Sequence, residues 1–509
     1  MDPNYSQEII LVSPKQSSSP GKRKITPSPE SSVSKKHIVI SSPKGHRPQP
    51  LLSSSNAIHA LTTELLPPRG TVIELRCRFP LTHAHPEFHP DSPQDTPMTL
   101  PTSREVTFEF DLHLQPAEFL SIDRRKLLLD IFPGAHRVEF NERVLVFYFD
   151  QLPAKPWPKK VAGVPCYLTD NENDRGPSFP TRHRSLSRIT VADHLDLRGK
   201  EEATDRIFNL AKDYFNSSCI PVSEIQFWGR VMIIVLDDIQ SDGILIKVPR
   251  SIAKCNCFYL FEEEVGRPPL LPVMRSKSAS TRAGEIDDSL YDNLRPGVIL
   301  SSGKRPEDDS EFFTSSGVLV KNVNGDKLLT VAAHGFPGHP HDCRVYHPNH
   351  SGKSVGEVIM EIAHTGIALV RLDEGVEFSN ETFENTVIPG PSVKFTGFSR
   401  TTETRIGDNV YLDSPFSGFL EGTRLAHAIL RVPSDDPLAV EQKWIRCQWH
   451  YMGQGSGEAI VDGICGSAIW DDDHKVVGFF RYAPASGIFV DSCLTVAADQ
   501  LLDKGYTLV

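Results

Sequence analysis

The sequence predicts a mostly β protein, in which an α+β domain precedes a closed antiparallel β domain with a C-terminal helix. Short strand-like segments separated by turn residues run from about residue 295 to 492, a spacing typical of closed β architectures. The segment before them mixes strand-like runs with an amphipathic helix. Forty Pro and 34 Gly also disfavour a helical bundle.

The length of 509 residues, 39% of them hydrophobic, predicts two or three domains. Residues 1–55 are expected to be a disordered tail and 56–265 an α+β domain of unassigned role. Residues 266–294 follow as a linker, and 295–509 form the β domain.

The tail differs from the body in charge. Residues 1–50 carry eight basic and three acidic side chains, a net charge of +5, which leaves −16 for the remainder of a chain with −11 in total. Eleven Ser and eight Pro there leave too little apolar surface to offset chain entropy. Two basic clusters predict a contact with a nuclear import receptor: Lys22, Arg23, Lys24, Lys35 and Lys36. The alternative is a solvated tail that carries no targeting signal.

Several segments of the α+β domain have a recognisable period. Residues 106–112 alternate apolar and polar side chains, which predicts a half-buried strand. Four further strands are expected at 143–149, 225–236, 243–248 and 257–262. Residues 205–217 repeat apolar side chains at helical spacing, and residues 494–502 predict the C-terminal helix.

Composition also bears on compartment and partners. The start of the chain has no apolar signal segment and no apolar run approaches the ~20 residues that span a bilayer. We therefore expect an intracellular protein of the nucleus or cytoplasm, neither secreted nor in contact with a membrane. Nine scattered Cys form no disulfide framework, and the acidic body disfavours nucleic-acid binding outside the tail.

A hairpin presents the first chemically informative residue. Ser316–Val320 and Leu328–Gly335 flank Asn324-Gly325, a strong hairpin signal because both turn residues adopt positive φ. His334 is therefore expected on a turn just past the second strand. A buried strand is expected at Thr365–Leu372.

The second informative segment is Gly463-Ile464-Cys465-Gly466, which precedes the apolar strand Ala468–Trp470. These three elements resemble, in the same chain order, the Thr-Ala-Ala-His, Asp-Ile-Ala-Leu and Gly-x-Ser-Gly elements of the two-barrel chymotrypsin-like proteases. Cys465 in place of Ser is similar to the 3C-like cysteine proteases of that fold. The resemblance covers about residues 295–509.

The resemblance implies an endopeptidase that hydrolyses peptide or protein substrates. Cys465 would be the nucleophile and His334 the general base, because a thiol attacks a carbonyl as thiolate and needs an imidazole partner. The backbone N–H groups of Gly463 and Cys465 would stabilise the oxyanion. Phe480 and Arg481 would contact the residue before the cleaved bond, Arg481 favouring an acidic side chain.

One position departs from the family: Gly366 stands where the carboxylate of the third member would fall. Glu361 is the preferred substitute, with Asp373 and Glu374 also open. Loss of the acid favours an alternative function, in which a catalytically inactive protease fold binds peptides or proteins without cutting them. A third possibility is self-cleavage near residues 266–286.

No cofactor or metal is expected. The sequence has no phosphate-cradling or dinucleotide motif. The His-rich loop with His83, His85 and His89 lacks a regular face. Cys255 and Cys257 are separated by one residue instead of the two or more usual in zinc sites, and they are expected to fill the core.

Overall fold

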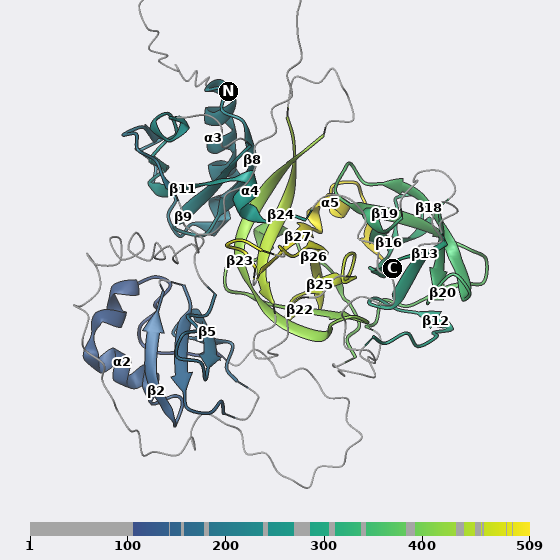
Figure 1. The fold of residues 1–509 in the computed structure, drawn as a ribbon, viewed down its shortest axis with the longest axis horizontal. Coiled ribbons are helices and arrows are strands. Elements are labelled where there is room, and N and C mark those ends of the chain that lie inside the picture. Colours follow the sequence, from purple (N-terminus) through teal and green to yellow (C-terminus); the bar gives the residue numbers. More distant parts are fainter. Residues whose placement is uncertain are drawn as a thin grey trace, which may run out of the picture. The chain divides into compact units, whose positions relative to one another are not determined.

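The computed structural model describes residues 105–509 except 142, 154–156, 178–182, 238–242, 269–285, 305–310, 337–342, 383–391, 434–441, 453–459, 461–462, 485 and 491. The predicted tail, its basic clusters and the His-rich loop lie outside the described residues, as does most of the predicted linker. Within the described part, no helix is long and apolar enough to cross a membrane. The predicted mostly β class is confirmed (Figure 1).

The first described sheet has the strand order β1-β4-β5-β3-β2. Helix α2 (Ile122–Leu129) buries Leu128 and Leu129 against β3, whose five residues are all buried. The strands and the preceding 3-10 turn have these bounds: β1 (Glu105–Val106), β2 (Ala135–Phe140), β3 (Leu145–Phe149), β4 (Lys160–Val161), β5 (Val164–Thr169) and η1 (Pro116–Leu120).

A second group of strands packs against helix α3 (Thr204–Ser217), which confirms the helix predicted at 205–217. The helix places Ile207, Phe208, Ala211 and Phe215 in the core, as its apolar spacing requires. The other elements are β6 (His183–Arg184), β7 (Thr190–Val191), η2 (Glu201–Ala203), β8 (Val222–Phe227), β9 (Val231–Leu236), η3 (Ile244–Ile246), β10 (Ser251–Ile252), β11 (Cys255–Phe261) and α4 (Glu262–Val265).

An eight-stranded antiparallel sheet carries the predicted His334 hairpin. Its order is β14-β13-β17-β18-β19-β16-β15-β28. The bounds are β13 (Ile299–Lys304), β14 (Glu311–Ser315), β15 (Leu319–Lys321), β16 (Lys327–Ala332), η4 (Ala333–Gly335), β17 (Arg344–His347), β18 (Lys353–Glu361), β19 (Ile367–Leu372) and β28 (Thr507–Leu508). A separate parallel pair is formed by β12 (Asn293–Leu294) and β20 (Glu377–Phe378).

Six strands close into a barrel, because β22 pairs with both β25 and β23 at the two ends of the order β22-β25-β26-β27-β24-β23. All six pairings are antiparallel. The bounds are β21 (Gly397–Phe398), η5 (Thr401–Glu403), β22 (Asn409–Ser414), β23 (Gly418–Val432), β24 (Lys443–Met452), β25 (Ala468–Trp470), β26 (Lys475–Tyr482), β27 (Ser492–Ala497) and α5 (Asp499–Leu502).

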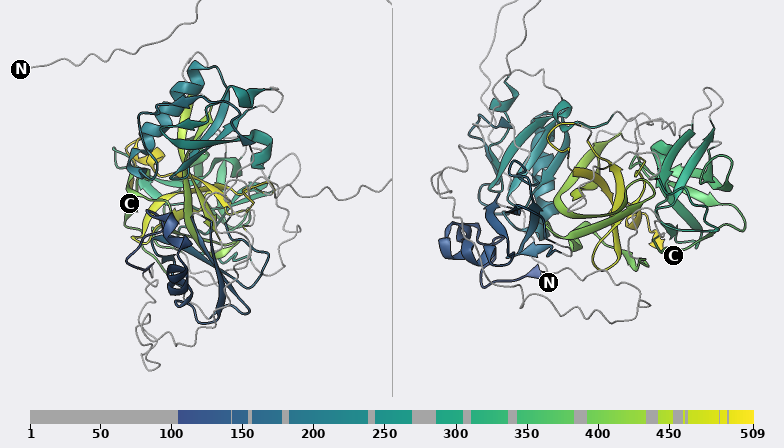
Figure 2. Two further views of the ribbon diagram at one scale, coloured as in Figure 1. Left: turned by 90° about the vertical axis from the view of Figure 1, so that its left-hand side faces the viewer. Right: turned by 60° about the horizontal axis from the view of Figure 1, so that its bottom comes forward.

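Strand β23 joins this barrel to the α3 sheet. Its first part pairs with β22, and residues His427–Leu430 pair with β8 on the edge away from β24. Trp228 and Ile233 accordingly share a hydrophobic core with the barrel residues Trp449 and Leu494. Figure 2 shows the same strands in two turned views. The α3 sheet and the barrel therefore form one continuous β structure.

Five sequence predictions differ from the structure. Strand 106–112 ends at Val106, because Asp111 accepts hydrogen bonds from the N–H groups of His113 and Leu114 and turns the chain. Residues 225–236 are two strands separated by Gly229 at φ +81°. Residues 243–248 contain the 3-10 turn η3 in place of a strand.

The fourth difference lies at the C-terminus, where residues 494–497 belong to β27 and the helix is only α5. Every residue of β27 is buried, so its apolar run has no period that distinguishes a strand from a helix. The predicted hairpin is confirmed. Its turn is wrong in type, since only Gly325 of the pair has a positive φ.

Candidate active site

His334 follows β16 directly and lies in the turn η4. The turn is held to the start of β19, because the Ala333 N–H donates to the Gly366 carbonyl oxygen at 2.8 Å. The imidazole is half-buried. Burial, and secondarily the positive charge of Arg481, lowers its pKa from 6.5 to about 4. His334 is therefore a neutral imidazole near pH 7.

Cys465 lies on the loop before β25, between two glycines with left-handed backbone. Gly463 has φ +94° and Gly466 φ +89°, a region that favours glycine. A Cβ atom on Gly466 would lie 2.8 Å from the Ala332 nitrogen and 2.9 Å from the Ser315 oxygen. The close approach of this loop to the His334 strand therefore requires glycine at 466.

The Cys465 loop is bonded to the eight-stranded sheet. The Ser315 N–H donates to the Cys465 carbonyl oxygen at 3.2 Å, and the Thr314 hydroxyl donates to the same oxygen. The Cys465 thiol donates to the Arg481 carbonyl oxygen at 3.3 Å. Sequence reasoning missed Thr314 and Ser315, whose role comes only from this contact between distant strands.

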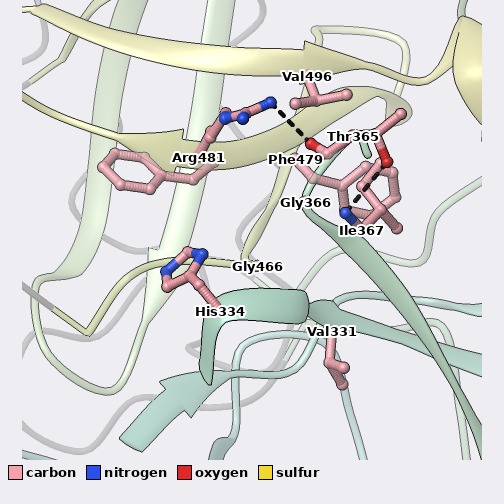
Figure 3. Close-up of a pocket in the computed structure, with 10 residues that line it drawn as sticks. Val331, His334, Thr365, Gly366, Ile367, Gly466, Phe479, Arg481 and Val496 are labelled. Atoms are coloured by element: carbon pink, nitrogen blue, oxygen red, sulfur yellow. Dashed lines mark hydrogen bonds between the residues drawn. The ribbon is translucent and has the colours of Figure 1, made fainter. Parts of the chain in front are cut away.

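A small cavity of about 10 Å³ lies where the eight-stranded sheet meets the barrel. His334, Gly366, Gly466 and Arg481 all line it, and Figure 3 shows His334 and Arg481 reaching it from different elements. The remaining lining residues are Val331, Thr365, Ile367, Phe479, Phe480 and Val496. The structure thus brings the His334 turn and the loop that carries Cys465 to one cavity.

Glu361, the predicted substitute for the third carboxylate, holds a turn. Its Oε1 accepts the N–H of Gly366 at 2.8 Å, and Gly366 has φ +82°. The charges that shift the His334 pKa include Arg481 and not Glu361. The carboxylate thus stabilises the start of β19, next to the cavity that His334 lines.

Arg481 lies next to Gly366, the position at which the sequence predicted no carboxylate. Its Nη1 donates to the Thr365 carbonyl oxygen at 3.0 Å (Figure 3). A Cβ atom on Gly366 would lie 4.0 Å from the Arg481 Cζ. A cation therefore lies next to Gly366, in the lining of the cavity that His334 also lines. The predicted preference of Arg481 for an acidic substrate residue stays a prediction.

Phe480, the other predicted substrate contact, forms backbone hydrogen bonds with the two residues that follow Cys465. Its carbonyl oxygen accepts the Gly466 N–H and its own N–H donates to the Ser467 oxygen, both at 2.9 Å. The side chain is 5% exposed and lines the cavity.

Among the described residues, no group of three His, Cys, Asp or Glu side chains is placed to hold a metal ion.

The position of His334 predicts an unusual titration. We expect its ring to protonate near pH 4, and to contribute stability that is present above pH 6.5 and lost as the pH falls through about 4. Histidine-selective NMR, assigned with His334→Gln, measures this pKa. Arg481→Gln should raise the pKa without reaching 6.5, since burial remains the larger cause. A wild-type pKa of 6 or more would contradict the prediction.

Comparisons with known proteins give structural neighbours only. No protein-family model matches the chain, and no curated protein matches it. Three similar solved structures are a glutamic-acid-specific serine protease with a histidine triad in substrate binding (14% identity, TM-score 0.31, 42% of this chain and 100% of that chain), a Nocardiopsis protease (14%, 0.31, 42% and 98%) and a chymotrypsin of Cellulomonas bogoriensis (14%, 0.30, 43% and 99%). These neighbours are chymotrypsin-like serine proteases.

Proposed function

We propose that the chain is an endopeptidase that uses Cys465 as nucleophile and His334 as general base. The observation that carries the proposal is the meeting of two loops: the residue after Cys465 and the His334 ring line one cavity, although 131 positions separate His334 from Cys465. Glycines at 463 and 466, both in left-handed backbone, give the Cys465 loop the tight turn that an oxyanion site needs.

The proposed reaction begins with a neutral thiol and a neutral imidazole. His334 takes the thiol proton as the Cys465 sulfur attacks the scissile carbonyl carbon, and the N–H groups of Gly463 and Cys465 stabilise the oxyanion. His334 then gives its proton to the leaving amine, which breaks the C–N bond. Water hydrolyses the thioester with His334 again as base, and the thiol is regenerated.

A low His334 pKa supports a neutral pair over a preformed thiolate–imidazolium pair. Burial and Arg481 both disfavour the imidazolium. The proton transfer is therefore uphill in the free protein, and we expect slow turnover.

A second candidate, a non-catalytic peptide-binding scaffold, is favoured by one specific observation. A guanidinium, not a carboxylate, stands beside Gly366 and next to His334. Such a site would hold an extended peptide as an added strand without cutting it. The two candidates differ in whether Cys465 reacts.

Labelling with a thiol-reactive peptide electrophile separates the two candidates. We expect the wild type to label at Cys465, Cys465→Ala to lose that label, and His334→Ala to label at least about 100-fold more slowly. Cys219→Ser is the matched control, because Cys219 is an exposed free thiol outside the site. Equal labelling of wild type, Cys465→Ala and His334→Ala contradicts the peptidase. Binding of intact peptides without cleavage supports the scaffold.

Compartment and processing are proposed on sequence grounds. The basic clusters of the tail support an import receptor as partner and a nuclear or cytoplasmic location. Incubation of the full chain tests self-cleavage near residues 266–286, since fragments should form in the wild type and not in Cys465→Ala.

A further inference from the structure

An extended segment beside the α3 sheet presents a row of large side chains to solvent. From residue 183 to residue 188 the side chains alternate between partly buried and exposed. Ser185 and Ser187 point inward, since both hydroxyls donate to the Val248 carbonyl oxygen at 2.5 Å. Successive side chains of an extended chain point to opposite sides, so the alternate residues face solvent. These outward residues are Arg184, Leu186 and Arg188.

A second segment, residues 245–250, lies directly against the first. The Leu186 N–H donates to the Leu245 carbonyl oxygen at 2.8 Å, and the Arg250 N–H donates to the Ile189 carbonyl oxygen at 2.7 Å. The two segments therefore form one surface, which we call the basic–apolar face. Its exposed residues are Arg184, Leu186, Arg188, Ile246, Lys247 and Arg250.

The basic–apolar face has four cations and no carboxylate of its own. Residues 183–191 and 243–261 contain no Asp or Glu. Among the described residues, none of the four cations forms an ion pair with Asp or Glu, and the Glu264 carboxylate beside the face pairs with His183. Partial burial, and secondarily the positive charge of Arg250, lowers the pKa of Arg184. The face is therefore positive, although the whole chain has a net charge of −11.

Two exposed aliphatic side chains lie among these cations. Leu186 is 72% exposed and Ile246 58%, and contact with an apolar phase would remove their surface from water. Neither 183–191 nor 243–250 contains Phe, Tyr or Trp, the rings on which nucleic-acid bases stack. An anionic membrane matches both features, because its headgroups attract the cations and its acyl region accepts the aliphatic side chains.

We propose that the basic–apolar face docks on an anionic lipid surface, with Leu186 and Ile246 inserted between the headgroups and the four cations paired with lipid anions. Such a peripheral contact needs no membrane-spanning segment, so the proposal departs from the sequence-based expectation that the chain does not contact a membrane. The acidic remainder of the body is repelled by an anionic surface, which favours docking through this face. The inference does not depend on the proposed peptidase activity.

Co-sedimentation with vesicles tests the role of charge. The vesicles contain phosphatidylcholine with about 30% phosphatidylserine, and pure phosphatidylcholine vesicles are the reference. We expect the full chain to bind the anionic vesicles alone, and to be largely released when salt rises from about 0.1 M to about 1 M. Arg184→Glu combined with Arg250→Glu should bind at least about 25-fold more weakly, because each cation near an anionic membrane contributes about fivefold.

Two controls separate the basic–apolar face from the other positive charges of the chain. Arg371→Glu combined with Lys321→Glu changes the net charge equally at exposed positions of the eight-stranded sheet, and should bind like the wild type. Alanine at the three cations of residues 22–24 should weaken binding less than the Arg184 and Arg250 variant does. Loss of all binding in the variant of residues 22–24, or equal binding by the wild type and the Arg184 and Arg250 variant, overturns the proposal.

A fluorescent probe tests the insertion of the aliphatic side chains. Leu186→Trp should add emission that brominated acyl chains quench in anionic vesicles, over the wild-type background. The control Val323→Trp, at a hairpin position that is 83% exposed, should add emission that is not quenched. Leu186→Ser combined with Ile246→Ser should weaken vesicle binding on the order of tenfold. Unchanged binding in this variant, or no quenching in Leu186→Trp, contradicts insertion.

Other polyanions would also be attracted to the four cations. Polyglutamate and a single-stranded oligonucleotide are therefore compared with the vesicles in the same buffer. Binding to either of them without binding to anionic vesicles overturns the lipid assignment. Arg188→Gln combined with Lys247→Gln gives a second pair of substitutions on the face, and it should also weaken vesicle binding about 25-fold. Thermal unfolding of each variant near the wild-type temperature shows that the change in binding is not a loss of the fold.

Discussion

Replacing Arg267 by alanine is expected to lower the free energy of unfolding by about 3–5 kcal/mol at pH 7. Its Nη2 donates to Glu224 Oε2 at 2.6 Å, and its Nη1 donates to the Tyr482 hydroxyl at 2.9 Å. Glu224 lies on β8 and is fully buried. Its other oxygen accepts the Trp449 indole N–H at 2.6 Å. The arginine therefore neutralises a carboxylate between the α3 sheet and the barrel.

The loss should grow with pH. Burial raises the pKa of Glu224, and Arg267 opposes the rise. Without Arg267 the folded pKa rises further, so stability falls as the pH increases from the unfolded value through the folded one. In the folded variant, the ionised Glu224 carboxylate is then less stable than the protonated one.

Urea unfolding followed by tryptophan fluorescence at pH 5 and pH 8 measures this effect. Arg344→Ala is the matched control, because Arg344 pairs with Asp373 at an exposed site, where solvent screens the ion pair and its contribution to stability is small. Adding Glu224→Gln to Arg267→Ala should recover part of the stability and remove most of the pH dependence. A loss for Arg267→Ala no larger than for Arg344→Ala would show that Glu224 needs no partner.

Gly466→Ala is expected to separate the two loops of the site and to lower the alkylation rate of Cys465 at least about 100-fold. The added Cβ would lie 2.8 Å from the Ala332 nitrogen and 2.9 Å from the Ser315 oxygen, both backbone atoms that cannot rotate away. The residue also has φ +89°, which costs a non-glycine residue about 1–3 kcal/mol. Alanine therefore moves the Cys465 loop away from β16.

Gly325→Ala separates the effect of backbone strain from the effect of the Cβ contact. Gly325 has φ +88°, but a Cβ atom there meets nothing within 4 Å. It should cost backbone strain alone and leave the alkylation rate of Cys465 near that of the wild type. Thermal unfolding and labelling of both variants check this, and equal labelling of Gly466→Ala and wild type would show that the contact with β16 does not position Cys465.

Sequence patterns predicted the segments in which local information is strong. The helical spacing of Ile207 and Ala211 predicted α3, and Asn324-Gly325 predicted the hairpin before His334. The glycines around Cys465 predicted a tight turn, and both have left-handed backbone. In each case the period or the turn chemistry depends on a few neighbouring residues.

Local patterns did not predict the secondary structure of segments that depend on contacts with other parts of the chain. Residues 107–112 kept their alternation of burial, with Phe110 and Leu112 buried, but formed no strand because Asp111 turns the chain. Residues 494–497 became part of β27 because β24 and β26 lie on either side of them. Strand pairing is a contact between segments that are distant in the sequence. An apolar run therefore does not indicate which strand it will pair with.

The sequence alone determined the fold class, the hairpin that ends at His334 and the glycine-framed turn of Cys465. Tertiary structure alone decided that Arg481 approaches Gly366 across 115 positions of chain and places a guanidinium beside the His334 imidazole. The sequence gives the charge of each side chain, but the Coulomb interaction between two charges depends on their distance and burial. For Arg481 and His334, both quantities are set only when the eight-stranded sheet packs against the barrel.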